Sequence, residues 1–221
     1  MDRDASHRSL HRTRIKFCGI TRQQDLDDAI RLGVDALGFV CVPGSKRYLS
    51  PADAGQLRAR MSPMVTSVLL LSDAPREAVL KALEQVKPDL IQFHGSESPD
   101  FCDSFDCGYI KAVSVHQESD VRTAVERYPG AKALLLDAPL QNGLGGTGTS
   151  FDWTLIPRDL PTPIILAGGL NPENVGRAVR MAPLFAVDVS SGIESAPGVK
   201  DLRQMQGFVR AVQLADDKRS R

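Results

Sequence analysis

The chain is predicted to fold as a single-domain α/β (β/α)8 TIM barrel, in which eight parallel strands alternate with helices. Short aliphatic runs alternate with amphipathic stretches along the whole sequence, eight such units can be counted, and no linker interrupts them. Several of the aliphatic runs are nearly continuous in Val, Ile and Leu, as is typical of parallel strands covered by helices. A doubly wound open sheet is the alternative, but no G-x-G-x-x-G follows the first strand.

The expected elements follow from these runs in order. The strands, each a short aliphatic run, are expected at 14–18, 35–40, 65–71, 89–93, 109–115, 132–136, 163–167 and 184–189. The helices are expected at 22–32, 51–61, 75–86, 98–104, 118–127, 152–157, 172–181 and 200–213. Pro51, Pro75 and Pro172 fit helix starts, and Ser50 and Asn171 are suitable caps. We expect the barrel domain to span 14–215, after a disordered extension (1–13) and before a tail (216–221).

Composition is ordinary for a soluble globular protein, and the charge is balanced. The 221 residues carry 27 basic and 27 acidic side chains, so no global field attracts nucleic acid or an anionic membrane. No apolar run approaches the ~20 residues that span a bilayer, and the first 14 residues lack the apolar stretch of a secretory signal. The four cysteines form no C-x-x-C pair, and we expect them to be reduced, in a cytoplasmic protein.

Cys18 and Asp137 each end an aliphatic strand, and the carboxyl ends of barrel strands hold the active site. A thiol that takes a proton and a carboxyl that gives one are the parts of an isomerase. Lys16 alternates with Cys18, so both side chains should point into the barrel, where an ammonium favours the thiolate. We expect Asp188, in the neighbouring last strand, to pair with Lys16. The alternatives are a buried structural thiol and a turn-forming aspartate.

Glycine-bearing turns follow the last three strands, at 145–148, 167–169 and 190–192. Glycines allow backbone N–H groups to approach an anion, and phosphate sites in these barrels frequently form after strands seven and eight. The turns therefore predict a phosphate site. The alternative is that these glycines only turn the chain.

Two further residues, Arg47 and His94, are expected at the site. Arg47, in the loop after the second strand, could clamp a carboxylate with two parallel hydrogen bonds, or belong to a solvated basic loop. His94 ends the fourth strand and is expected to line the pocket. The histidines show no metal-ligand spacing and no Walker-type loop is present, so we expect metal-free acid–base chemistry with no cofactor.

Several motifs spread over residues 14–201 resemble the phosphoribosylanthranilate isomerase family of tryptophan biosynthesis. They are Lys16-Phe-Cys-Gly-Ile-Thr21, Gly38-Phe-Val40, Ser45-Lys-Arg-Tyr-Leu-Ser-Pro51, Gln92-Phe-His-Gly95, Leu135-Leu-Asp137, Gly145-Gly-Thr-Gly148, Phe151-Asp-Trp153, Leu166-Ala-Gly-Gly-Leu-Asn-Pro172 and Val187-Asp-Val-Ser-Ser-Gly192. Each motif alone is weak, but their joint order is specific. The sequence departs from the family pattern at Cys41, at Thr149 and in the residues before Arg14.

The resemblance implies an intramolecular aldose–ketose isomerase that performs an Amadori rearrangement of N-(5-phosphoribosyl)anthranilate. It implies Asp137 as the general acid at the ribose ring oxygen, Cys18 as the base at C2, and Arg47 as the residue that recognises the anthranilate carboxylate. Residues expected to bind the phosphosugar substrate are Arg47, His94, Gly145, Gly146, Gly168, Gly169, Asp188, Ser190, Ser191 and Gly192. We expect a monomer or weak homodimer. The alternatives are a histidine-pathway aminoaldose isomerase, whose relatives carry Asp where Cys18 stands, and a non-catalytic phosphosugar-binding module.

Overall fold

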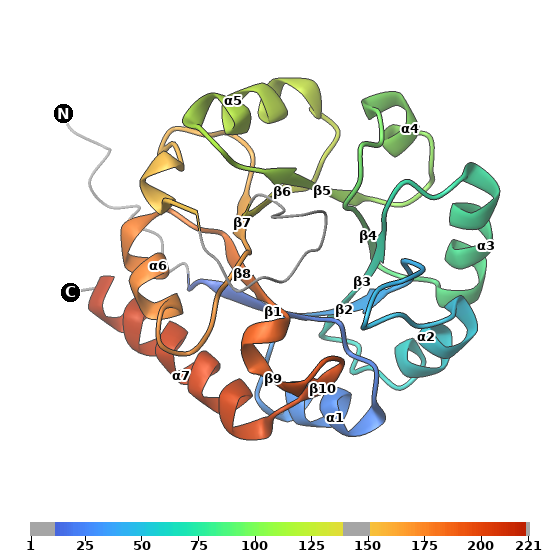
Figure 1. The fold of residues 1–221 in the computed structure, drawn as a ribbon, viewed down its shortest axis with the longest axis horizontal. Coiled ribbons are helices and arrows are strands. Elements are labelled where there is room, and N and C mark those ends of the chain that lie inside the picture. The colour runs from blue at the N-terminus through green and yellow to red at the C-terminus, as the bar shows by residue number, and fades with distance from the viewer. Residues whose placement is uncertain (1–11, 139–150, 220–221) are drawn as a thin grey trace.

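A closed barrel of eight parallel strands forms the centre of the molecule, and the helices surround it (Figure 1). The computed structural model describes residues 12–138 and 151–219. The strands, which pair in sequence order until β1 and β8 close the ring, are β1 Arg14–Cys18, β2 Ala36–Val40, β3 Thr66–Leu71, β4 Leu90–Phe93, β5 Tyr109–Ser114, β6 Ala133–Asp137, β7 Ile164–Leu166 and β8 Ala186–Val189. The predicted fold class is confirmed.

The helices lie on the outside of this ring (Figure 1). They are α1 Gln23–Arg31, α2 Pro51–Arg58, α3 Arg76–Val86, α4 Pro99–Asp103, α5 Glu118–Arg127, α6 Val175–Met181 and α7 Leu202–Arg219. Ser50 caps α2 as expected, because its side chain accepts a hydrogen bond from the Asp53 backbone N–H. None of the helices in the described part of the chain is long and apolar enough to cross a membrane.

Strand alternation divides the core into two layers. Ile15 and Phe17 face outward into the large cluster between barrel and helices, where the rings of Phe17 and Phe208 on α7 pack in a T-shaped arrangement. Aliphatic side chains such as Val68 and Leu135 fill the barrel interior. Cys18 lies in a small cluster above them, at the carboxyl end of the strands. The expectation that Cys18 points into the barrel is confirmed.

The structure differs from the expected elements at several places. Only a 3-10 turn, η1 Trp153–Leu155, stands where a helix was expected at 152–157. After β8, a second 3-10 turn (η2 Ser191–Ile193) leads into an unpredicted hairpin, β9 Glu194–Ala196 and β10 Val199–Lys200. Helix α7 extends to Arg219, so the tail expected from residue 216 begins inside a helix. Thr13, expected in the extension, is buried and donates two hydrogen bonds to Asp216.

A buried Lys111–Glu97 pair holds the loop after β4 in place. The Lys111 ammonium donates to the Phe93, Gly95 and Ala112 carbonyls and lies 3.4 Å from Glu97 Oε2. Glu97 in turn accepts from the Gly95 backbone N–H at 3.0 Å. Because this loop begins at His94, the pair also fixes one residue of the predicted site.

Replacing Lys111 with methionine should lower the free energy of unfolding by about 3–5 kcal/mol, because Glu97 would remain buried without its cation. Urea denaturation of the variant measures this loss. Lys132→Met, which removes an exposed lysine nearby in the chain, is the matched control and should stay close to wild type. Equal midpoints for the two variants would contradict the assignment.

Candidate active site

Lys16 and Asp188 form a buried ion pair inside the barrel, as predicted. The Lys16 ammonium donates to Asp188 Oδ1 at 2.9 Å across the β1–β8 register. Burial alone would lower the pKa of Lys16, but the charges and hydrogen bonds of Asp188 and Cys18 together outweigh burial, and the pKa is raised. Asp188, expected among the substrate-binding residues, is buried and bonded to Lys16 in the described structure.

Cys18 is buried beside this pair at the end of β1. Burial raises the pKa of the Cys18 thiol, and the charge of Lys16 opposes that rise without cancelling it. Gly38 on β2 makes room for the thiol, because a Cβ at that position would lie 2.8 Å from Cys18 Sγ. The thiol is therefore enclosed and, in the absence of a further influence, protonated at neutral pH.

A chain of polar side chains leads from Lys16 across the barrel to Asp137. Lys16 also donates to Gln92 Oε1 at 3.0 Å, and Gln92 Nε2 lies 3.0 Å from His94 Nδ1. His94 Nε2 lies 3.5 Å from Asp137 Oδ2. Gln92 was not predicted as a site residue. The available signal was its alternation with His94, which places a polar side chain inside an otherwise apolar strand.

The chemistry of the donors and acceptors fixes the direction of these hydrogen bonds. An ammonium can only donate, so the Gln92 oxygen must face Lys16 and its amide nitrogen must donate to His94 Nδ1. A neutral His94 then carries its proton on Nε2, which faces the Asp137 carboxyl group. His94 can therefore stabilise the carboxylate that remains when Asp137 gives up a proton.

Asp137 ends β6 and is partly exposed. Its side chain is 28% exposed. Oδ1 accepts a hydrogen bond from the Ala138 backbone N–H at 2.8 Å. Gly168 approaches the same oxygen so closely that a Cβ there would lie 2.7 Å from it. The carboxyl group thus lies between the ends of β4 and β7, at the mouth of the barrel.

The turns after β7 and β8 lie against each other, as a phosphate site requires. Gly168 and Gly169 have φ of +77° and +63°, conformations that favour glycine. A Cβ on Gly192 would lie 1.9 Å from the Leu170 carbonyl oxygen, so only glycine allows this approach. Ser190 Oγ is buried with no hydrogen-bond partner among the described residues, which leaves the hydroxyl available to a ligand. Gly145 and Gly146 lie outside the described residues.

Arg47 does lie at the site, but its fork is already engaged. Its side chain passes over Gly19, where a Cβ would lie 2.5 Å from Arg47 Cδ. Nε and Nη2 donate to the two carboxylate oxygens of Glu194 at 2.8 and 2.7 Å. The two parallel hydrogen bonds predicted for a ligand carboxylate are thus made to Glu194. Nη1, on the opposite side of the guanidinium, takes part in neither of them. Glu194 was missed because its segment was not expected to form structure.

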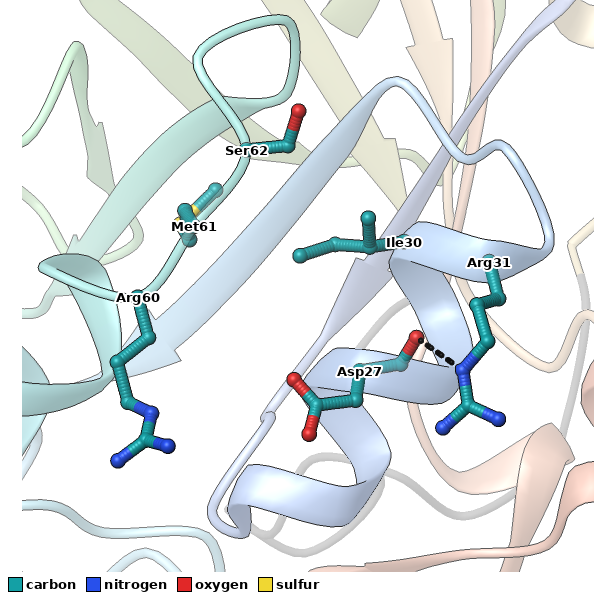
Figure 2. Close-up of a pocket in the computed structure, with 6 residues that line it drawn as sticks. All are labelled: Asp27, Ile30, Arg31, Arg60, Met61 and Ser62. Atoms are coloured by element: carbon teal, nitrogen blue, oxygen red, sulfur yellow. Dashed lines mark hydrogen bonds between the residues drawn. The ribbon is translucent and has the colours of Figure 1, made fainter.

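A surface pocket lies away from this site. It is lined by residues at the end of α1 and in the segment after α2: Asp27, Ile30, Arg31, Arg60, Met61 and Ser62 (Figure 2). These segments lead into β2 and β3, so the pocket lies at the amino end of the strands, opposite the candidate active site. Within residues 12–138 and 151–219, no group of three or more His, Cys, Asp or Glu side chains is placed to hold a metal ion.

Comparison with known proteins identifies the family. The family described as N-(5'phosphoribosyl)anthranilate (PRA) isomerase matches residues 15–211. The chain belongs to the phosphoribosylanthranilate isomerase family. A family member from Stenotrophomonas maltophilia (strain R551-3), N-(5'-phosphoribosyl)anthranilate isomerase, is 47% identical over 211 residues, which are 95% of this chain and 97% of the relative.

Solved structures of phosphoribosylanthranilate isomerases share the fold. The Thermotoga maritima enzyme superposes with a TM-score of 0.84 at 38% identity, covering 91% of this chain and 98% of that one. A crystal structure of a phosphoribosylanthranilate isomerase in complex with reduced 1-(o-carboxyphenylamino)-1-deoxyribulose 5-phosphate has a TM-score of 0.78 at 34% identity, with 91% and 98% coverage. The resemblance found in the sequence motifs therefore extends over nearly the whole chain.

Proposed function

We propose that this chain catalyses the Amadori rearrangement of N-(5-phosphoribosyl)anthranilate to 1-(2-carboxyphenylamino)-1-deoxyribulose 5-phosphate, the isomerase step of its family in tryptophan biosynthesis. The observation that carries the proposal is the pairing of Cys18 and Asp137 at the carboxyl ends of β1 and β6, together with family membership over residues 15–211. The adjoining turns after β7 and β8 supply a place for the phosphate.

In the proposed reaction, Asp137 donates its proton to the ribose ring oxygen as the C1–O bond breaks and a Schiff base forms. Cys18, as the thiolate, then removes the C2 proton and leaves an enolamine, which tautomerises to the ketone. His94 is placed to stabilise the Asp137 carboxylate that the first step produces. These steps leave Asp137 ionised and Cys18 protonated, and proton exchange with solvent restores both groups before the next turnover, so the sum of the reaction is an isomerisation.

Incubation of the purified wild-type protein with N-(5-phosphoribosyl)anthranilate tests this proposal, with NMR identification of the product. We expect the aminoketose, formed without any added cofactor. Recovery of unrearranged substrate would reject the proposed activity and favour the non-catalytic binding module.

Arg47→Ala is expected to weaken recognition of the anthranilate carboxylate, which the resemblance assigns to Arg47. A lost charge-assisted hydrogen bond is worth about 1.5–3 kcal/mol, so KM should rise by roughly one to two orders of magnitude. Steady-state kinetics measure the change. Arg203→Ala removes an exposed arginine on α7 and serves as the matched control. An unchanged KM in Arg47→Ala would remove that residue from the site.

The pH dependence of kcat/KM should report the buried thiol. Burial raises the pKa of Cys18, and the proposed mechanism needs Cys18 ionised and Asp137 protonated at once, so the profile should be bell-shaped, with one limb set by this elevated pKa. We expect the midpoint of that limb to lie above the ordinary thiol value of about 8.5. A profile with no limb above pH ~8.5 would contradict the assignment of Cys18.

Finer properties remain proposals. We propose a cytoplasmic protein that is a monomer or a weak homodimer, with a barrel domain that includes Thr13, which is buried and bonded to Asp216. The balanced surface charge supports a small-molecule substrate rather than nucleic acid. Light scattering after gel filtration across a range of protein concentrations would report the oligomeric state.

A further inference from the structure

Two charged side chains of the β9–β10 hairpin are buried next to the candidate active site and have no part in the proposed chemistry. The side chains of Glu194 and Lys200 are 5% and 0% exposed. The hairpin that carries them follows the phosphate turn of β8 and lies near β1 and α1 (Figure 1). Burying an unpaired charge costs free energy, so both side chains should have compensating partners.

Lys200 joins three parts of the site through its ammonium group. It donates to the Cys18 carbonyl at 2.6 Å, to the Ser190 carbonyl at 3.1 Å and to Glu194 Oε1 at 2.8 Å. Three acceptors match the three N–H donors of an ammonium. Lys200 therefore ties the backbone of the predicted base to the backbone of the predicted phosphate turn.

Glu194 joins Arg47 to the same ammonium. Its carboxylate accepts two parallel hydrogen bonds from the Arg47 guanidinium and one from Lys200. Such a bidentate pair fixes the plane of the guanidinium as well as its position. Burial alone would raise the pKa of Glu194, but the hydrogen bonds and charges of Arg47 and Lys200 outweigh it and the pKa is lowered.

We propose that Glu194 and Lys200 are positioning residues of the isomerase, which join Arg47 to the Cys18 and Ser190 backbones in one rigid unit. This unit sets the distance between the groups expected to hold the substrate's carboxylate and phosphate, and places the thiol between them. The inference rests on the proposed function. It adds that the hairpin aligns the carboxylate end of the substrate through Arg47 and the phosphate end through Ser190.

Glu194→Gln tests the first half of this arrangement. A neutral amide cannot accept both parallel hydrogen bonds, so Arg47 should lose its fixed orientation while Cys18 and Asp137 remain in place. We expect KM for N-(5-phosphoribosyl)anthranilate to rise about tenfold, with little change in kcat. Glu84→Gln, an exposed glutamate on α3, is the matched control.

A double-mutant cycle with Arg47→Ala separates positioning from general weakening of the fold. If Glu194 acts through Arg47, Glu194→Gln should raise KM no further once Arg47 is alanine. Effects of the two substitutions that multiply would overturn this role. If Glu194→Gln does not fold, Glu194→Asp takes its place in the cycle, because it keeps the charge and shortens the reach.

Lys200→Met tests the second half with inorganic phosphate as the probe. Calorimetric titration should show weaker phosphate binding to Lys200→Met than to wild type, because the Ser190 backbone has lost its tie. Lys81→Met, which removes an exposed lysine on α3, is the matched control and should bind phosphate like the wild type. Equal phosphate affinity in Lys200→Met and wild type would overturn the tie to the phosphate turn.

Failure of this inference is distinguishable from failure of the proposed function. Absence of turnover by the wild-type protein would reject the function, whereas phosphate titration needs no turnover. Normal wild-type turnover with an unchanged KM in Glu194→Gln would reject only the positioning role. If Lys200→Met does not fold, Lys200→Arg replaces it, since a guanidinium keeps the charge but cannot reproduce the three ammonium contacts.

Discussion

Cys18→Ala is expected to lower kcat by about 10²–10⁴-fold, the contribution of a positioned general base. The thiol lies inside the barrel, enclosed beside Lys16 and facing Gly38. No other described thiol can replace it, because Cys41, Cys102 and Cys107 do not lie in the small cluster of Cys18 at the strand ends. KM should change far less than kcat, since the expected phosphate and carboxylate contacts remain.

Two further variants make this prediction specific. Cys18→Ser keeps the size of the side chain but replaces the thiol with a hydroxyl that does not ionise near neutral pH, so it should be about as inactive as Cys18→Ala. Cys107→Ala removes a half-buried cysteine elsewhere and should keep wild-type kcat. A Cys18→Ser variant with near-normal kcat would show that no thiolate is needed.

Asp137→Asn is expected to produce a comparable loss in kcat, about 10²–10⁴-fold, because an amide cannot donate the proton that opens the ribose ring. The substitution keeps the shape of the side chain, so an acceptor for the Ala138 backbone N–H remains. The variant should therefore fold normally and bind substrate with a similar KM. Rapid-mixing assays at several substrate concentrations separate the two constants.

An exposed aspartate supplies the control for Asp137. Asp159→Asn removes a surface carboxylate that pairs with Arg122, and it should leave kcat unchanged. Equal kcat values for Asp137→Asn and Asp159→Asn would remove Asp137 from the role of acid. The variant His94→Gln should have an intermediate effect, since the proposed role of His94 is to stabilise the Asp137 carboxylate from 3.5 Å without transferring a proton.

Local sequence patterns predicted the barrel and part of the candidate site. Nearly continuous aliphatic runs marked the eight strands, and every predicted strand end lies within two residues of the observed one. Alternation along β1 and closure of the ring also predicted the Lys16–Asp188 pair, because a buried ammonium needs a partner on a neighbouring strand. Such predictions succeed where the rule is periodic along the chain.

Other contacts between segments that are distant in the sequence were not predicted. Gly38 faces the Cys18 thiol, and Glu194 holds Arg47, yet each pair joins segments whose distance in space no local pattern gives. The β9–β10 hairpin was missed because five strand residues separated by a short turn give little periodicity. The prediction that Arg47 binds a ligand carboxylate therefore did not include Glu194, whose carboxylate Arg47 binds in the structure.

The most direct test of the central claim compares turnover of two substrates by the wild-type protein in the presence of a metal chelator. One is N-(5-phosphoribosyl)anthranilate, and the other is the aminoaldose substrate of the histidine-pathway isomerase. With a thiol base at Cys18, we expect rapid consumption of the first and at most slow consumption of the second. Preferential turnover of the histidine-pathway substrate, or no turnover of phosphoribosylanthranilate, would contradict the account.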